Sequence, residues 1–202
     1  MTPLPDRLLV VTDRRLAARD LPSAVHEAVS AGAGWVWFRD KDLAREERLA
    51  LARQVQAAIG GRAVMTVGSD IGLATELGLK AVHLSMSADV ASARLRLGAD
   101  ALIGLSAHSL SDVALAKAKE ADYVTLSPIF ETISKPGYGP SLGLGILRPA
   151  SALGIPIIAL GGINPGIVKA VMDEGVDGIA VMGGIYMEDQ TEKNVIAYLA
   201  EL

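Results

Sequence analysis

Short apolar runs alternate with longer amphipathic segments along the whole chain. The runs are rich in β-branched residues and have the length of buried strands, and each ends abruptly at polar residues or glycine. We therefore expect a strand in each of eight runs: Leu8–Val11, Gly34–Phe38, Ala63–Val67, Ala81–Leu84, Ala101–Leu105, Tyr123–Leu126, Pro156–Leu160 and Gly178–Met182.

Between the runs, apolar residues recur at three- and four-residue spacing, which predicts amphipathic helices. Ser109, Ser111 and Asn164 are candidate N-caps, and Gly32 and Gly175 stand where a left-handed residue would end a helix. The predicted helical segments are Leu21–Ala31, Arg45–Ala58, Ile71–Leu77, Val90–Leu97, Leu110–Glu120, Gly145–Leu153, Pro165–Glu174 and Glu192–Leu202.

Strict alternation of strands and helices with right-handed crossovers gives either a closed barrel or an open doubly wound sheet. Eight units favour the barrel. An open sheet would also need a glycine-rich turn after its first strand, where this chain has Thr12-Asp13-Arg14. No linker or low-complexity stretch divides the 202 residues. We expect residues 1–202 to form a single (β/α)8 TIM barrel domain with its ligand site at the carboxyl ends of the strands.

The composition excludes several classes of protein. A net charge of −4 argues against a nucleic-acid partner, whose phosphates require a basic face. There is no cysteine, which excludes disulfides and thiolate chemistry. No apolar run approaches the ~18–20 residues that span a bilayer, and the first residues lack a signal-peptide pattern. A mean hydropathy of +0.36 suits strands that are covered on both faces. We expect a cytoplasmic protein with no membrane contact.

The last two predicted strands each end in a glycine pair, Gly161-Gly162 and Gly183-Gly184. Glycine lets the backbone approach a ligand closely, and a helix N-terminus offers unpaired N–H groups. Barrels of this kind bind phosphate at the loops after their last two strands. The repeated pattern therefore predicts a phosphate site. The alternative is that the glycines only permit tight strand-to-helix turns.

Other charged and hydroxyl residues follow the strand ends, namely Arg39, Lys41, Ser106, His108 and Lys135. Three cations at one mouth of an acidic protein indicate an anionic ligand, which we expect to be a phosphorylated small molecule. The alternatives give these residues no role in ligand binding. The run of residues 39–42 could pair with itself in solvent, and Lys135 could be a surface lysine. A histidine inside an apolar strand, as at position 83, is more often a core residue than a catalyst.

The segment Ser127–Leu144 is long, irregular and rich in glycine and proline. Loops of this length inside a compact domain are usually functional. It follows the sixth predicted strand, on the same barrel face as the glycine pairs, so it could close over a ligand as a lid.

Several segments carry a resemblance when they are taken together, namely Val36–Lys41, Ala81–Leu84, Ser106–Leu110, Ser127–Lys135, Ala159–Ile163 and Gly178–Met182. In this order they resemble the thiamine phosphate synthase and thiazole tautomerase superfamily. The resemblance covers nearly the whole chain and implies a barrel that acts late in thiamine biosynthesis. The synthase joins a pyrimidine methyl diphosphate to a thiazole phosphate and expels pyrophosphate with Mg²⁺, whereas the tautomerase shifts a proton within a thiazole carboxylate phosphate.

The resemblance implies roles for individual residues. Arg39 and Lys41 match a basic pair that handles pyrophosphate and the pyrimidine, while Trp37 stands in place of that motif's glutamine. Ser106 matches a serine near the reacting pyrophosphate. A loop that contacts thiazole phosphate and pyrophosphate is matched by Thr132, Ser134 and Lys135, and phosphate-binding turns are matched by Gly161, Gly162, Gly183 and Gly184.

The chain also departs from the family pattern. Gly68-Ser69 stands where the synthase has an Asn-Asp pair whose aspartate binds Mg²⁺. Ser85–Ala88 stands where a second Mg²⁺ ligand belongs, with Asp89 one residue out of register. Mg²⁺ is thus implied by resemblance while its usual ligands are replaced, and no other Asp and Glu cluster predicts a metal site. The tautomerase histidine is matched by Pro128, which leaves His108 as the candidate general base.

Three functions follow as hypotheses. The first is an enzyme of thiamine biosynthesis that acts on a thiazole phosphate, either a divergent synthase or a tautomerase-like isomerase. The second is a non-catalytic family member that binds a phosphorylated or anionic heterocycle as a carrier, sensor or partner subunit. The third is another phosphate-binding barrel enzyme, for which we find no acid–base pair. Family habit and the apolar surplus predict a homodimer.

Overall fold

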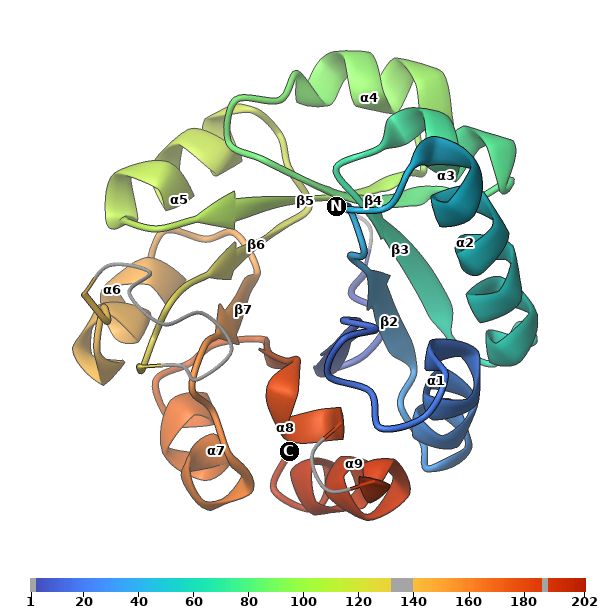
Figure 1. Cartoon of the computed structure of the whole chain (residues 1–202). Helices are drawn as coiled ribbons and strands as arrows, with labels where there is room; N and C mark the ends of the chain where they lie inside the picture. The colour runs from blue at the N-terminus through green and yellow to red at the C-terminus, as the bar shows by residue number, and fades with distance from the viewer. Residues whose placement is uncertain (1–2, 132–139, 187–188) are drawn as a thin grey trace.

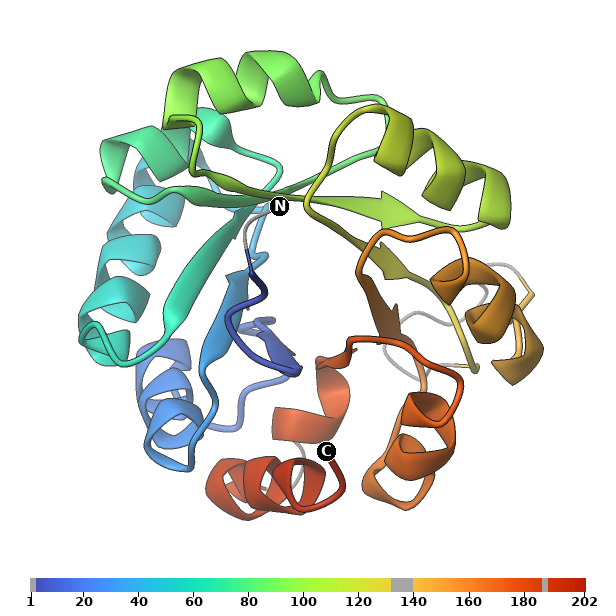
Figure 2. The ribbon, with the colours of Figure 1, turned by 180° about the vertical axis from the view of Figure 1, so that it is seen from behind.

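The computed structural model describes residues 3–131, 140–186 and 189–202. In these residues the parallel strands β1 to β8 close into a barrel in sequence order, with β1 hydrogen-bonded to both β2 and β8. Figures 1 and 2 show the strands at the centre and the helices in a ring outside them. The predicted (β/α)8 barrel is confirmed. The strands are β1 (Leu8–Val11), β2 (Trp35–Phe38), β3 (Val64–Gly68), β4 (Ala81–Leu84), β5 (Leu102–Ala107), β6 (Tyr123–Leu126), β7 (Ile157–Leu160) and β8 (Gly178–Val181).

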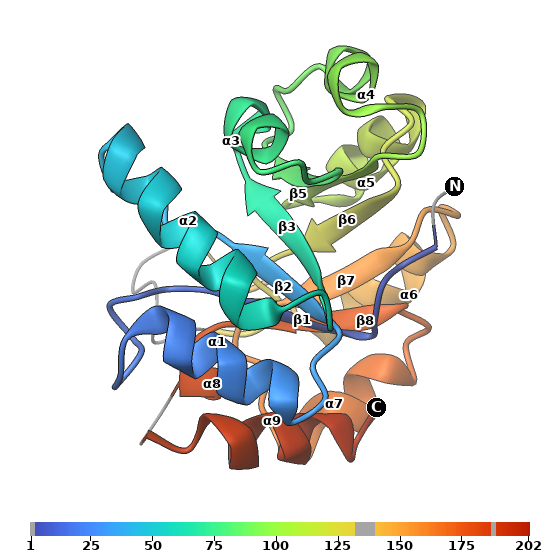
Figure 3. The same ribbon diagram turned by 90° about the vertical axis from the view of Figure 1, so that its right-hand side faces the viewer.

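The helices follow the predicted segments closely. Figure 3 shows α1 and α2 lying along the outside of the strands. Across the described ranges, no helix is long and apolar enough to cross a membrane. The helices are α1 (Leu21–Ser30), α2 (Arg45–Ile59), α3 (Ile71–Glu76), α4 (Val90–Leu97), α5 (Leu110–Ala118), α6 (Leu147–Ser151), α7 (Pro165–Met172), α8 (Gly183–Tyr186) and α9 (Thr191–Leu199).

The structure differs from the sequence prediction at a few helix ends. The segment predicted as Gly145–Leu153 is divided into a 3₁₀ turn, Leu144–Ile146, and the short α6. Ser109 caps α5 by accepting the Asp112 N–H, so Ser111 is not the cap. Asn164 precedes α7 but its side chain makes no capping bond. The short helix α8 was not predicted, because four residues are too few to show helical periodicity.

The barrel strands are buried on both faces, which explains the high hydropathy. Alternate residues of one strand belong to two separate apolar clusters. Leu8 and Val10 pack with helix residues in the outer layer, whereas Leu9 and Val11 pack with Trp35 and other residues of the barrel interior. Side chains therefore fill the lumen, and a ligand is left with the mouth that the carboxyl ends of the strands form.

Candidate functional site

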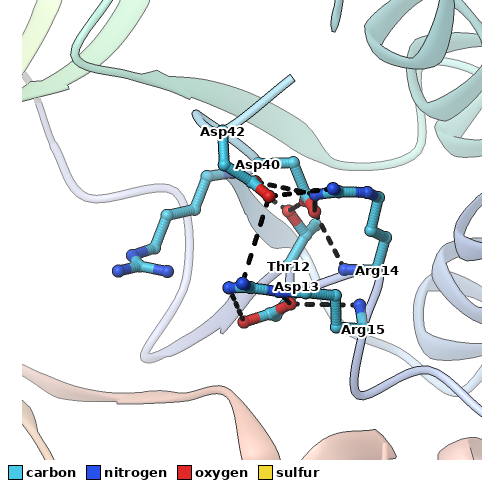
Figure 4. A network of polar contacts seen from close by, with 7 residues as sticks. Thr12, Asp13, Arg14, Arg15, Asp40 and Asp42 are labelled. Atoms are coloured by element: carbon cyan, nitrogen blue, oxygen red, sulfur yellow. Dashed lines mark hydrogen bonds and ion pairs between the residues drawn. The ribbon is translucent and has the colours of Figure 1, made fainter. Parts of the chain in front are cut away.

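The loops after β1 and β2 are bound together by a buried carboxylate (Figure 4). The Thr12 hydroxyl donates to Asp40 Oδ2 over 2.7 Å and accepts from the Arg39 N–H over 3.0 Å. Asp40 Oδ1 accepts from the backbone N–H of Arg14 over 2.9 Å. The Asp40 side chain is 1% exposed, so these partners replace the water that its charge would otherwise require. The network holds the first part of the mouth in one conformation.

The acidic residues of this network are paired with arginines from the β1–α1 loop. Arg14 makes a two-pronged contact with Asp42, with N–O distances of 2.7 and 2.8 Å, and Arg15 lies 3.3 Å from Asp13. The hydrogen bond from Arg14 holds the pKa of the Asp42 carboxyl well below its usual range. The carboxylates at positions 40 and 42 therefore pair with another loop, which contradicts the alternative that residues 39–42 pair with one another.

Arg39 and Lys41 follow β2, and their charges are not neutralised by the described residues. Arg39 is half-buried and Lys41 is exposed. Among the described residues, neither side chain has a hydrogen-bond acceptor or an ion-pair partner, because the neighbouring Asp40 and Asp42 form ion pairs with Arg14. Two cations at the mouth are thus available to an anion.

A buried histidine lies beneath the mouth and orients one candidate residue. His83 Nε2 lies 3.0 Å from the Ser106 hydroxyl and 3.1 Å from the Thr125 hydroxyl, and Nδ1 lies 3.1 Å from the Tyr123 hydroxyl. Burial lowers the pKa of His83 to about 3, so its ring is neutral at physiological pH. The expectation of a core histidine is confirmed. Its ring fixes the Ser106 hydroxyl at the end of β5.

Besides Nε of Arg48, two buried polar atoms near the mouth have no partner among the described residues. The Trp37 indole N–H is one, and its ring lies against His83 with centroids 4.1 Å apart. The hydroxyl of Tyr186, on α8, is the other. Burial raises the pKa of Tyr186, and the charges of Asp40 and Asp13 raise it further. The hydroxyl of Tyr186, in the turn after β8, is therefore within reach of the charges of Asp40 and Asp13.

His108 lies at the mouth, at the end of β5, and its ring contacts the next strand's loop. Its Nδ1 is 2.7 Å from the carbonyl oxygen of Ser127. A carbonyl only accepts, so Nδ1 is the donor of this hydrogen bond. Ser127 precedes Pro128, the position to which the resemblance assigns the tautomerase histidine. The structure therefore places an imidazole beside that position.

The glycine pairs follow the neighbouring strands β7 and β8. A Cβ on Gly162 would lie 2.4 Å from the Glu131 carbonyl oxygen, and a Cβ on Gly184 would lie 2.2 Å from the Tyr198 hydroxyl. The close approach of other parts of the protein thus suffices to explain one glycine of each pair. Gly161 has a φ of +109°, and Gly183 begins α8. Phosphate binding at these turns stays a prediction.

Comparisons with known proteins agree with this geometry. A family model described as thiamine monophosphate synthase matches residues 8–185. The chain belongs to this family. A thiamine-phosphate synthase of Methanosarcina barkeri is 32% identical over 91% of this chain and 84% of its own. A thiamine-phosphate synthase of Nitrosococcus oceani is 35% identical over 95% and 90%.

The solved structures agree as well. A structure described as thiamine phosphate pyrophosphorylase from Pyrococcus furiosus has a TM-score of 0.85, with 27% identity over 96% of this chain and 94% of that one. The predicted membership of the thiamine phosphate synthase superfamily, and with it a barrel of thiamine biosynthesis, is confirmed.

The Mg²⁺ that the resemblance implies does not fit the residues present. Asp70, next to Gly68-Ser69, accepts the Leu73 N–H at the start of α3 and pairs with Arg48 over 3.0 Å. Asp89 caps α4 through Ser92. In the part of the chain that the structure describes, no three His, Cys, Asp or Glu side chains are grouped to hold a metal ion. Neither aspartate replaces the missing ligands.

Three of the predicted site residues, Thr132, Ser134 and Lys135, lie outside the described residues. The expected lid loop, Ser127–Leu144, includes the undescribed positions 132–139, and its closure over a ligand stays a prediction. Their roles stay predictions from the resemblance.

Several residues that shape the mouth could not be found from the sequence. Asp40 and Arg14 gave no local signal, because each has its partner on another loop. Tyr186 gave none, because the carboxylates that raise its pKa, Asp40 and Asp13, lie on other loops. Arg48 did give one. It occupies the buried stripe of α2 with Ala52, Val55 and Ile59, where a charged side chain needs a buried partner.

Proposed function

We propose that the chain binds a thiazole phosphate at its mouth and joins it to a pyrimidine methyl diphosphate, the reaction for which its family is named. The carbon–oxygen bond to the diphosphate breaks, the thiazole nitrogen bonds to the methylene carbon, and pyrophosphate leaves. The observation that carries the proposal is the pair of cations after β2, Arg39 and Lys41, whose acidic neighbours Asp40 and Asp42 are paired with Arg14.

The proposal gives each predicted site residue a role, and the roles of Thr132, Ser134 and Lys135 rest on the resemblance alone. Arg39 and Lys41 would stabilise the charge that develops on the departing pyrophosphate, and Lys135 would join them from the loop after β6. Ser106, oriented by His83, would hydrogen-bond to the same group. Thr132 and Ser134 would contact the thiazole phosphate, and the glycine turns after β7 and β8 would hold it. The N–H of Trp37 would meet an acceptor on the bound heterocycle.

A second candidate is a tautomerase-like isomerase, which His108 favours. The Ser127 carbonyl accepts from its Nδ1 and fixes the imidazole ring at the mouth. Such a group can move a proton within a bound thiazole carboxylate phosphate. A non-catalytic member of the family would bind the same ligand without converting it. A cytoplasmic location and a homodimer remain predictions.

The test is to incubate the full chain with both synthase substrates, in Mg²⁺ and separately in EDTA, and to measure thiamine phosphate by mass spectrometry. Product that falls by about tenfold or more in Arg39→Ala and in Lys41→Ala supports the proposal. Lys80→Ala is the matched control, because Lys80 precedes β4 at the opposite end of the barrel and pairs with Asp100. The absence of product in both buffers contradicts the synthase. Hydrogen exchange into a bound thiazole carboxylate phosphate, lost in His108→Gln, would then indicate the isomerase.

A further inference from the structure

Arg48 is a charged residue enclosed by the protein at the edge of the mouth. It lies in the first turns of α2, and its side chain is 9% exposed. Its Nη1 donates to Asp70 Oδ2 over 3.0 Å, and its Nη2 donates to the Gly68 carbonyl over 2.6 Å. The guanidinium also lies 5.8 Å from the centre of the Phe38 ring. These contacts hold one positive charge at a single place.

That place is the turn after β3, where the resemblance calls for metal-binding carboxylates. Gly68 and Ser69 bring no carboxylate, and both oxygens of Asp70 are used, one by the Leu73 N–H and one by Arg48. A cavity of about 220 Å³ lies beside this turn, between α2 and α3, and Lys41 and Arg48 both line it. Since Lys41 is also one of the two cations after β2, the cavity adjoins the proposed anion site.

We infer that Arg48 is a fixed internal cation that takes the place of a divalent metal ion at the turn after β3. Its charge offsets that of Asp70, so the turn repels a second cation and does not repel the anionic ligand that Lys41 attracts. An arginine is suited to this use because it stays protonated even when it is buried. The identity of the anion as pyrophosphate rests on the proposed function, whereas the exclusion of a divalent cation does not.

The backbone conformation of this turn allows a variant in which carboxylates replace the internal cation. Ser69 has a φ of +59°, and its N–H donates to the His83 carbonyl over 2.8 Å. Aspartate and asparagine tolerate this left-handed conformation better than most residues. The double variant Arg48→Leu/Ser69→Asp therefore removes the internal cation, releases Asp70 and adds a second carboxylate at a position that accepts it.

Direct Mn²⁺ binding to the purified full chain tests the first half of the inference, with the electron paramagnetic resonance signal of free Mn²⁺ as the readout. We expect no binding by the wild-type chain at millimolar Mn²⁺, and affinity at least about tenfold higher in Arg48→Leu/Ser69→Asp. Stoichiometric Mn²⁺ binding by the wild-type chain, displaced by Mg²⁺, would overturn the inference. A double variant that folds but gains no Mn²⁺ affinity also contradicts it.

Calorimetric titration with inorganic pyrophosphate in EDTA tests the second half. We expect Arg48→Leu to bind about tenfold more weakly than the wild-type chain and Arg48→Lys to stay within about threefold. Arg45→Leu is the matched control, because Arg45 lines the same cavity but is exposed and paired with Glu76. Equal affinity in Arg48→Leu and the wild-type chain would refute a role for Arg48.

The outcomes separate the two proposals. If the wild-type chain binds no pyrophosphate in EDTA and forms no thiamine phosphate in either assay buffer, the proposed function fails, while the Mn²⁺ measurement still decides the inference. Circular dichroism shows whether Arg48→Leu folds. If it does not, Arg48→Gln, which removes the charge but can still donate to the Gly68 carbonyl, replaces Arg48→Leu in both titrations.

Discussion

His83 is a neutral imidazole sealed inside the barrel, and its protonation state makes stability depend on pH. Burial lowers the folded-state pKa to about 3, whereas the unfolded chain keeps the ordinary value of about 6.5. Between these values the unfolded state binds the extra proton. The stabilisation from His83 is therefore complete above pH 6.5 and is lost as the pH falls towards 3.

We expect the free energy of unfolding to fall by about 1.4 kcal/mol per pH unit below pH 6 through this group. His83→Gln should remove that part of the slope, since glutamine does not titrate. Urea denaturation between pH 4.5 and 7.5 measures it. His26→Gln is the control, because His26 is exposed, and an equal loss of slope in both variants would contradict the assignment.

At the scale of the elements, Asp40 fixes the β2–α2 loop to the β1–α1 loop. Removing one partner of a buried charged network leaves the other groups without hydrogen bonds. We expect Asp40→Ala to lower the free energy of unfolding by roughly 3 kcal/mol, measured by urea denaturation. Asp42→Ala breaks only an exposed pair and should cost clearly less. Similar losses in the two variants would mean that burial of Asp40 is unimportant.

A second prediction for the elements concerns the packing of β5 against its neighbours inside the barrel. A Cβ on Gly104 would lie 2.1 Å from the Tyr123 ring and 2.6 Å from His83 Nδ1. We therefore expect Gly104→Ala to destabilise the fold by about 3 kcal/mol, because the lumen cannot expand. Gly145→Ala is the control, since nothing lies within 4 Å of its Cβ position. A neutral Gly104→Ala in thermal unfolding would show that the interior is looser than described.

At the scale of the whole molecule, a ligand at the mouth should stabilise the entire barrel, because it touches loops from several strands. At a hundred times its Kd, thiazole phosphate should add about 2.7 kcal/mol. In a chain of this size that corresponds to a rise of roughly 5–10 °C in Tm. Differential scanning calorimetry with thiazole phosphate measures it. The dephosphorylated thiazole is the control, and an equal shift with that compound would exclude phosphate recognition.

Much of the fold was predictable because it depends on local patterns. Parallel strands covered on both faces are apolar throughout, so each strand was visible as an uninterrupted run such as Leu8–Val11. Helix ends were visible where glycine adopts a positive φ, as at Gly32 and Gly175. The short α8 was not, since one turn of helix has no period to detect.

The candidate site was predictable only in part. Arg39, Lys41, Ser106 and His108 all lie at the carboxyl ends of strands, as the order of the runs indicates. Their partners were not predictable, because each comes from another loop or strand. The sequence shows that Asp40 and Asp42 are close to Arg39, but it does not show that Arg14 binds both.

The sequence by itself determined the barrel, its order of elements and the family to which the chain belongs. These follow from hydrophobic periodicity and from short motifs, which are properties of neighbouring residues. Only the tertiary structure decided which charges are neutralised and which are available. Arg48 meets Asp70 across 22 positions and Arg14 meets Asp40 across 26, and such pairs form only when the closed barrel brings separate strand ends together.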